Sequence, residues 1–259
     1  MPSLLCEREG GTALVRLNRP AARNAVDGGS MAALEEAVER FAGDSSLRAV
    51  LLTGAGEDAF CAGGDLKWLQ SFPSAEEGCA VNGRMQGILS RLAALPVPVI
   101  AVLNGYALGG GTEIAFACDF RVMEEHAYLS CRQARIGMMT GWGGGARLLR
   151  LVGPSRAVEL LTTCREVGAR EALAMGLANA VVPRGAGLAE GRRLAAEIAK
   201  GAPLAIRAIK RFLAGAGELS PQEANELEAR LFGPLWASED HREAVRAFIE
   251  RRKPLFKGS

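Results

Sequence analysis

Residues 104–113 read Asn-Gly-Tyr-Ala-Leu-Gly-Gly-Gly-Thr-Glu, and they directly follow the apolar run Val97–Leu103. The apolar run predicts a buried strand, and the glycine cluster before Thr112 and Glu113 predicts the start of a helix. The first N–H groups of a helix lack partners and carry partial positive charge, so they stabilise an oxygen that gains negative charge. Glu113 lies one turn further on, where it could move a proton beside that oxygen. The alternative is a glycine-rich turn that serves only the packing of strand against helix.

A second stretch repeats this pattern earlier in the chain. Residues 48–54 predict a buried strand, and residues 60–66, Phe-Cys-Ala-Gly-Gly-Asp-Leu, predict another transition through glycine into a helix. Asp65 is placed as the N-cap or as an acid of the first turn. Two such strand ends can each direct one N–H group at the same oxygen.

Together, the Ala62-Gly63-x-Asp65 segment and the Asn104–Glu113 segment resemble the enoyl-CoA hydratase/isomerase (crotonase) superfamily. In that family the two segments supply the amides that hold the thioester carbonyl of an acyl-CoA. Shorter similarities follow in order along nearly the whole chain, among them 15–20, 117–121, 142–144, 176–177, 242–245 and 248–254. By position, the resemblance assigns Gly64 and Gly110 as the two oxyanion donors and Glu113 as an acid/base. The structural alternative for Glu113 is an acid that complements the helix dipole.

The resemblance also implies an α/β fold. Residues 1–187 are expected to form a spiral of ββα units, and residues 188–259 a helical region through which three chains, or two sets of three, associate. The helical periodicity of the second part predicts helices over 188–200, 203–213, 221–232 and 239–251. Glycine and proline at 201–203, 215–217 and 233–234 are expected to separate them. Amphipathic helices without strands cannot close a core alone, so they must pack on the first part or on neighbouring subunits.

Hydratases of the family carry a second glutamate about twenty residues after the first. Here that position holds Gln133, with the register set by Asp119 before it and Gly137 after it. A glutamine can orient water but cannot give or take a proton. The leading interpretation is an acyl-CoA enzyme of the hydratase/isomerase type with Glu113 as its one base. A 2-alkylmalonyl-CoA decarboxylase is the alternative, because loss of CO₂ forms the enolate without a base. A CoA-binding relative without catalysis is the third hypothesis.

Recognition of CoA follows from the resemblance alone. Main-chain atoms of four residues are expected beside the pantetheine and adenine, and two basic residues are candidates for the phosphates. A neighbouring subunit could close over the nucleotide with its C-terminal end. These positions are Ala22, Ala62, Gly63 and Leu66, then Arg23 and Lys67, then Phe256 and Lys257. Met138, Met139 and Trp142 are expected to line the acyl pocket, whereas Trp68 fits an ordinary core position better.

Composition excludes several other classes. The formal net charge is only +2 and the charges are dispersed, which disfavours a nucleic-acid-binding protein. No apolar stretch approaches the roughly twenty residues of a membrane span, and the first residues show no secretory signal. Six scattered cysteines fit reduced thiols in a cytoplasmic protein, and two histidines exclude a multi-histidine metal centre. No metal or separate cofactor is therefore expected, with CoA present only as part of the substrate.

Overall fold

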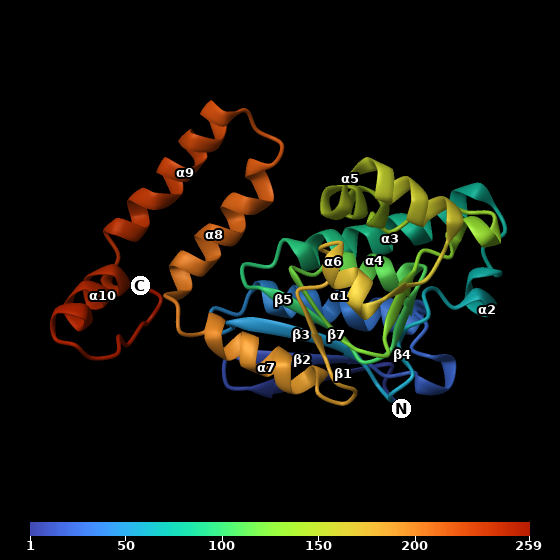
Figure 1. Cartoon of the computed structure of the whole chain (residues 1–259), viewed down its shortest axis with the longest axis horizontal. Helices are drawn as coiled ribbons and strands as arrows, with labels where there is room; N and C mark the ends of the chain where they lie inside the picture. The colour runs from blue at the N-terminus through green and yellow to red at the C-terminus, as the bar shows by residue number, and fades with distance from the viewer.

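The computed structural model describes all 259 residues, Met1–Ser259. Two β-sheets and the helices packed on them form the body, and the last three helices form an arm that projects from it (Figure 1). The larger sheet has the order β1 (Leu4–Glu9), β2 (Thr12–Leu17), β3 (Ala49–Gly54), β5 (Val99–Leu103), β7 (Phe120–Glu124) and β10 (Ala180–Val182). The smaller sheet has the order β4 (Ala59–Cys61), β6 (Tyr106–Leu108), β8 (Tyr128–Ser130) and β9 (Val167–Gly168).

The strands follow a repeating pattern. In three successive units, β3–β4, β5–β6 and β7–β8, the first strand joins the larger sheet and the second joins the smaller one, and helical turns follow each pair. Neighbouring strands within each sheet are parallel except for β1 with β2 and β8 with β9. The helical elements are η1 (Pro20–Ala22), α1 (Gly28–Ala42), α2 (Leu66–Leu69), α3 (Ala75–Ala93), α4 (Gly110–Phe116), η2 (Gln133–Ile136), α5 (Gly144–Thr163), α6 (Ala169–Ala174), α7 (Gly187–Ile198), α8 (Pro203–Ala216), α9 (Pro221–Trp236) and α10 (Glu239–Ile249). The predicted succession of ββα units is confirmed.

Strand β3 shows how the larger sheet is buried on both faces. Val50 and Leu52 pack in the main core with α1, α3 and the smaller sheet. Leu51 points to the opposite face, where it packs in a smaller cluster with Ala195 of α7. Side chains alternate along a strand, so a parallel strand covered on both faces needs apolar residues at every position. The apolar run at residues 49–52 of β3 therefore reflects this double burial.

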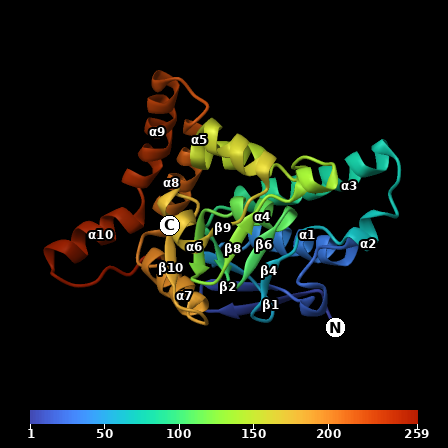
Figure 2. The same cartoon turned by 45° about the vertical axis from the view of Figure 1, so that its right-hand side comes forward.

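Helix α7 is the first helix of the predicted helical region, and it packs on β3, β5 and β7 of the body. The arm consists of α8, α9 and α10, and α8 packs mainly along α9. Figure 2 shows the arm on one side of the molecule and α2 and α3 on the other, as does Figure 1. None of the helices combines the length and the apolar character needed to cross a membrane.

The expected break at Gly233-Pro234 is wrong. Helix α9 continues through both residues to Trp236, and the break falls at Ala237-Ser238. Proline at position 234 removes only one N–H donor from the helix. The helical hydrogen bonding resumes after it, because the Ala237 N–H donates to the Gly233 carbonyl at 3.3 Å. Ser238 then caps α10 by accepting from the His241 N–H at 3.1 Å.

Candidate active site

Two glycine turns meet where the smaller sheet ends. Gly109 follows β6 with a φ of 51°, and Gly63 follows β4 with a φ of 99°, both in the region that favours glycine. A Cβ atom on Gly63 would lie 2.9 Å from the Leu108 carbonyl oxygen and 3.1 Å from the Gly110 nitrogen. One on Gly111 would lie 2.1 Å from the Cys61 carbonyl oxygen. Both turns can approach this closely only because side chains are absent.

The N–H groups of Gly64 and Gly110 are available beside this contact. Gly110 opens α4, whose first N–H groups have no partner within the helix, and neither glycine donates in any turn or loop hydrogen bond of the chain. The indole ring of Trp142 covers both residues. A Cβ on Gly110 would lie 2.3 Å from this ring and one on Gly64 would lie 3.6 Å from it. The pair expected from the sequence is thus brought together under one aromatic ring.

Glu113 lies in the first turn of α4 with only 2% of its surface exposed. Its Oε2 accepts from the N–H groups of Trp142 and Gly144, each at 2.8 Å. Its Oε1 accepts from the Gln133 side-chain amide at 2.9 Å and from the Gly141 N–H at 3.4 Å. Helix α5 has no side-chain cap of its own, so the Glu113 carboxylate satisfies the open N–H groups at its start.

Gln133 is the second side chain that the sequence placed in the site, and it begins the short helix η2. Its Nε2 donates to Glu113, whereas its Oε1 is buried and accepts no hydrogen bond. Residues 141–144 were not expected to contact Glu113. The glycines at 141, 143 and 144 are the feature of the sequence that could have indicated such contacts. The structure gives the reason for one of them, because a Cβ on Gly144 would lie 2.3 Å from Cγ of Glu113.

Gly64, Gly110, Glu113 and Gln133 all line one cavity of about 670 Å³. Trp142, Leu66 and Leu69 form part of its wall, and Met138 and Met139 lie along its rim with 48% and 81% of their surfaces exposed. Trp68 is not among the lining residues; it packs against the main core, as expected. Helix α3 adds a wall of small and polar residues that sequence reasoning missed: Ala75, Gly78, Cys79, Asn82, Gly83 and Gln86.

The positions expected to contact CoA fall into two groups. Ala22 and Arg23 lie beside the cavity, because the Ala62 N–H donates to the Arg23 carbonyl at 3.0 Å. Asp65 caps α2, which carries exposed Leu66 and Lys67, and the Arg19 guanidinium lowers the pKa of the Asp65 carboxyl. Phe256 and Lys257 lie beyond α10, where the Lys257 N–H donates to Asp240, and α10 is far from α2 in both views (Figures 1 and 2). Within one chain these two residues are not brought to the cavity.

Buried thiols lie directly behind the two turns. Burial raises the pKa of Cys61 to about 12 and that of Cys131 to about 11. The Cys131 sulfur lies 3.7 Å from the Thr112 hydroxyl. Both thiols stay protonated near neutral pH, so neither supplies a thiolate nucleophile. The ionisable side chains that line the cavity are Cys79, Glu113 and Arg132.

Comparison with known proteins identifies the family of this chain. The profile of the enoyl-CoA hydratase/isomerase family matches residues 7–259. A short-chain-enoyl-CoA hydratase of Clostridium acetobutylicum is 36% identical over 97% of this chain and 96% of its own. A carnitinyl-CoA dehydratase of Proteus mirabilis is 38% identical over 99% and 98%. The crystal structure of an enoyl-CoA hydratase from Bacillus anthracis superposes with a TM-score of 0.96 at 32% identity, covering 99% of this chain and all of that one.

These similarities extend along both the body and the arm, and they confirm the predicted crotonase fold. The chain belongs to the enoyl-CoA hydratase/isomerase family and is an acyl-CoA enzyme of that type.

Proposed function

We propose that this enzyme adds water to a 2-enoyl-CoA, or moves its double bond, through a thioester enolate bound at the two glycine turns. The N–H groups of Gly64 and Gly110 donate to the thioester oxygen. The start of α4 adds the positive end of a helix dipole beneath the same oxygen. An oxyanion donor of this kind typically contributes about a hundred- to a thousandfold in rate, because it acts on charge that appears only as the reaction proceeds.

Glu113 is the single acid and base of this proposal. The observation that carries it is a buried carboxylate in the same cavity as the two available N–H groups, with no second carboxylate lining that cavity. In hydration, Glu113 takes a proton from water as oxygen bonds to C3, and it returns that proton to C2 of the enolate. In isomerisation, the same carboxylate carries a proton between two carbons of the acyl chain.

The test is hydration of crotonyl-CoA by the parent and by Glu113→Gln. The amide keeps the shape of the side chain but cannot accept a proton. We expect kcat to fall by about 10²- to 10⁴-fold in this variant. The variant should still bind CoA, as measured by isothermal titration calorimetry. Glu125→Gln, at an exposed position outside the cavity, is the matched control and should keep full activity. Undiminished hydration by Glu113→Gln would exclude Glu113 as the base.

Decarboxylation of a 2-alkylmalonyl-CoA is the second candidate, and Gln133 is the observation in its favour. An amide replaces the second carboxylate that hydration uses in relatives, and decarboxylation needs no base to begin. Against it, the buried Glu113 carboxylate would face the carboxylate of such a substrate across the same cavity, and like charges repel. Release of CO₂ from ethylmalonyl-CoA, measured beside crotonyl-CoA hydration, separates the two. Acyl-CoA binding without turnover of either thioester would instead support a non-catalytic protein.

CoA is proposed to lie along the contact between residues 22–23 and 62–67. The Arg23 and Lys67 side chains would supply charge for its phosphates. The test is to measure CoA binding at several salt concentrations in Lys67→Gln. Arg8→Gln, at the far edge of the larger sheet, is the control. We expect weaker binding and a smaller salt effect in the first variant only.

No metal or separate cofactor takes part in the proposed reaction, and a cytoplasmic location remains a prediction from composition.

The arm is proposed to pack against other copies of this chain as a trimer or a dimer of trimers. Phe232, Trp236, Phe248 and Ile249 on α9 and α10 are each more than half exposed. Such a run of large apolar side chains on a projecting arm predicts a protein interface. Assembly would also bring the Phe256 and Lys257 of one chain towards the cavity of another.

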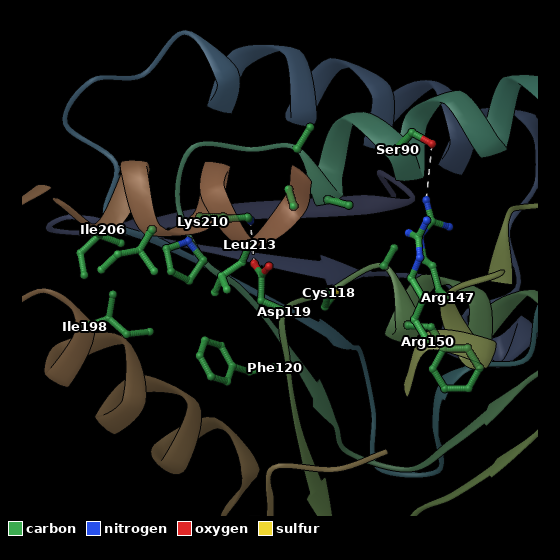
Figure 3. A pocket seen from close by; sticks show the side chains of 17 residues that line it. Ser90, Cys118, Asp119, Phe120, Arg147, Arg150, Ile198, Ile206, Lys210 and Leu213 are labelled. Carbon is green, nitrogen blue, oxygen red and sulfur yellow. Dashed lines mark hydrogen bonds and ion pairs between the residues drawn. The ribbon is translucent and has the colours of Figure 1, made fainter. Parts of the chain in front are cut away.

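A second cavity, of about 630 Å³, lies where α8 meets the body (Figure 3). Ile198, Ile206, Leu213 and Phe120 line one side of it, and Lys210 spans the gap to Asp119 with a 2.6 Å ion pair. We propose that a neighbouring copy covers this region in the assembly. Light scattering of the parent and of Trp236→Glu tests the assembly: the parent should have three or six times the mass of the chain and the variant less.

A further inference from the structure

The main chain beside Glu113 is held by few groups. Residues 139–142 form no hydrogen bond from main chain to main chain. Two side chains bind them instead. Glu113 accepts from the N–H groups of Gly141 at 3.4 Å and of Trp142 at 2.8 Å. The Arg147 guanidinium donates to the Trp142 carbonyl at 2.9 Å. A segment held by Glu113 alone could not fix the place of Glu113, so the Arg147 contact is the independent anchor.

The position of Arg147 near the start of α5 allows that contact. A helical side chain points back towards the N-terminus of its helix, and this direction brings the guanidinium over Gly143. A Cβ on Gly143 would lie 2.9 Å from Nη1 of Arg147, and Gly143 has a φ of 84°. Glycine meets both requirements. The chain therefore turns closely enough under the guanidinium for Nη1 to reach the Trp142 carbonyl.

The charge of Arg147 has no carboxylate partner within the chain. Its other acceptor is the Ser90 hydroxyl of α3 at 3.4 Å (Figure 3), whereas Arg150 pairs with Glu218. Burial lowers the pKa of the Arg147 guanidinium, and a cation near the start of a helix opposes the helix dipole. Both effects disfavour a cation at this position. The charge-assisted hydrogen bond to Trp142 is the contact that offsets them.

Trp142 connects this contact to both parts of the site. Its N–H donates to Glu113, and its indole ring covers Gly64 and Gly110. When Glu113 takes a proton, its carboxylate becomes neutral and its hydrogen bonds from the N–H groups weaken. Arg147 stays charged at that moment, because a guanidinium does not lose its proton in proteins. The Arg147 contact therefore persists while the base is neutral.

Resting on the proposed function, we propose that Arg147 is a positioning residue that holds Trp142, and through it Glu113 and the two oxyanion donors, in the geometry of the reaction. Arg147 does not line the catalytic cavity, so it acts without touching the substrate. Its loss should slow the chemical step and leave substrate binding largely intact. A shift of about 1 Å at a catalytic group can cost about a hundredfold in rate.

The experiment measures kcat and KM for crotonyl-CoA hydration in the parent, Arg147→Ala, Arg147→Lys and Arg150→Ala. We expect Arg147→Ala to lower kcat about a hundredfold and to change KM less than about threefold. Lysine keeps a charged donor and should return kcat to within about tenfold of the parent. Guanidinium chloride should raise the kcat of Arg147→Ala at least about tenfold, at concentrations where sodium chloride does not. Arg150→Ala removes a neighbouring cation of the same helix and should keep the kcat of the parent.

A second measurement needs no turnover. The chain has three tryptophans, so fluorotryptophan labelling gives three ¹⁹F resonances, and Trp142→Phe assigns the one from residue 142. We expect Arg147→Ala to shift this resonance alone and guanidinium to return it, whereas Arg150→Ala should leave it in place. Arg147→Met, which keeps the apolar stem, replaces the alanine variant in both measurements if that variant does not fold.

A parent-like kcat in the variant without the guanidinium would overturn the proposal, as would a loss that appears in KM alone. A fall in kcat that neither lysine nor guanidinium restores would also overturn it and leave Arg147 with a general structural role. Failure of the proposed function gives a distinct result, because hydration would then be absent from the parent or would survive in Glu113→Gln. The role of Arg147 in placing the base is then refuted, and the ¹⁹F resonance alone decides whether Arg147 holds Trp142.

Discussion

Alanine at position 110 is expected to damage the site without removing any of its polar groups. Its Cβ would lie 2.3 Å from Cζ3 and 2.5 Å from Cη2 of the Trp142 ring. Carbon atoms pack at about 3.5–4.0 Å, so the indole would have to move by about 1 Å. The Trp142 N–H donates to Glu113 at 2.8 Å, so displacement of Trp142 also displaces the base.

The size of the effect follows from these two consequences. Overpacking of a fitted site costs about 1–3 kcal/mol of stability, which a thermal unfolding curve detects. Misplacing an oxyanion donor and its base should lower kcat for crotonyl-CoA hydration by about 10²- to 10³-fold. Gly83→Ala is the control, since its Cβ meets nothing within 4 Å and Gly83 lines the same cavity. It should keep its kcat and gain up to about 1 kcal/mol, because alanine favours a helix interior.

A double variant identifies the cause. If Trp142 is the obstacle, adding Gly110→Ala to Trp142→Ala should cost less than about tenfold, far below its cost in the parent. An unaltered kcat and melting temperature in Gly110→Ala alone would refute the reasoning. So would an equal loss from Gly110→Ala with and without the indole ring.

Two further predictions concern stability. Arg121→Met should lower the free energy of unfolding by about 2–4 kcal/mol, since the buried guanidinium donates to the carbonyls of Leu177 and Cys118, each at 2.7 Å. Chemical denaturation measures this loss, and Arg156→Met at an exposed position is the control. The Arg252 guanidinium lowers the pKa of Glu243 to about 2 from 4.5. The stability that this carboxylate contributes to the C-terminal segment is therefore complete above pH 4.5 and is lost as the pH falls to about 2. The Leu255 amide, which donates to Glu243 at 2.9 Å, should shift its NMR resonance over that range in the parent and not in Glu243→Gln.

Local chemistry in the sequence indicated the two glycine turns and the N-cap of α2 at Asp65. Glycine permits the positive φ seen at Gly63 and at Gly109, and aspartate favours the N-cap seen at Asp65, so the sequence marks both turns and the cap without showing which glycine of each cluster adopts the positive φ. The apolar run of β3 likewise predicts a buried strand wherever the strand lies. Strand β1 was missed because its pattern is largely exposed. It is defined by antiparallel pairing with β2, and only the partner strand supplies that information.

The tertiary structure alone decided how Glu113 is held. Its partners at positions 133, 141, 142 and 144 reach it because β8 lies beside β6, which carries the turn before Glu113. No periodicity in the sequence reports which distant N–H groups will face a carboxylate. The sequence placed Gln133 in the site, but the direction of its amide depends on the carboxylate that it meets. Hydrogen-bond direction is a property of a pair of groups, and the fold decides which groups form the pair.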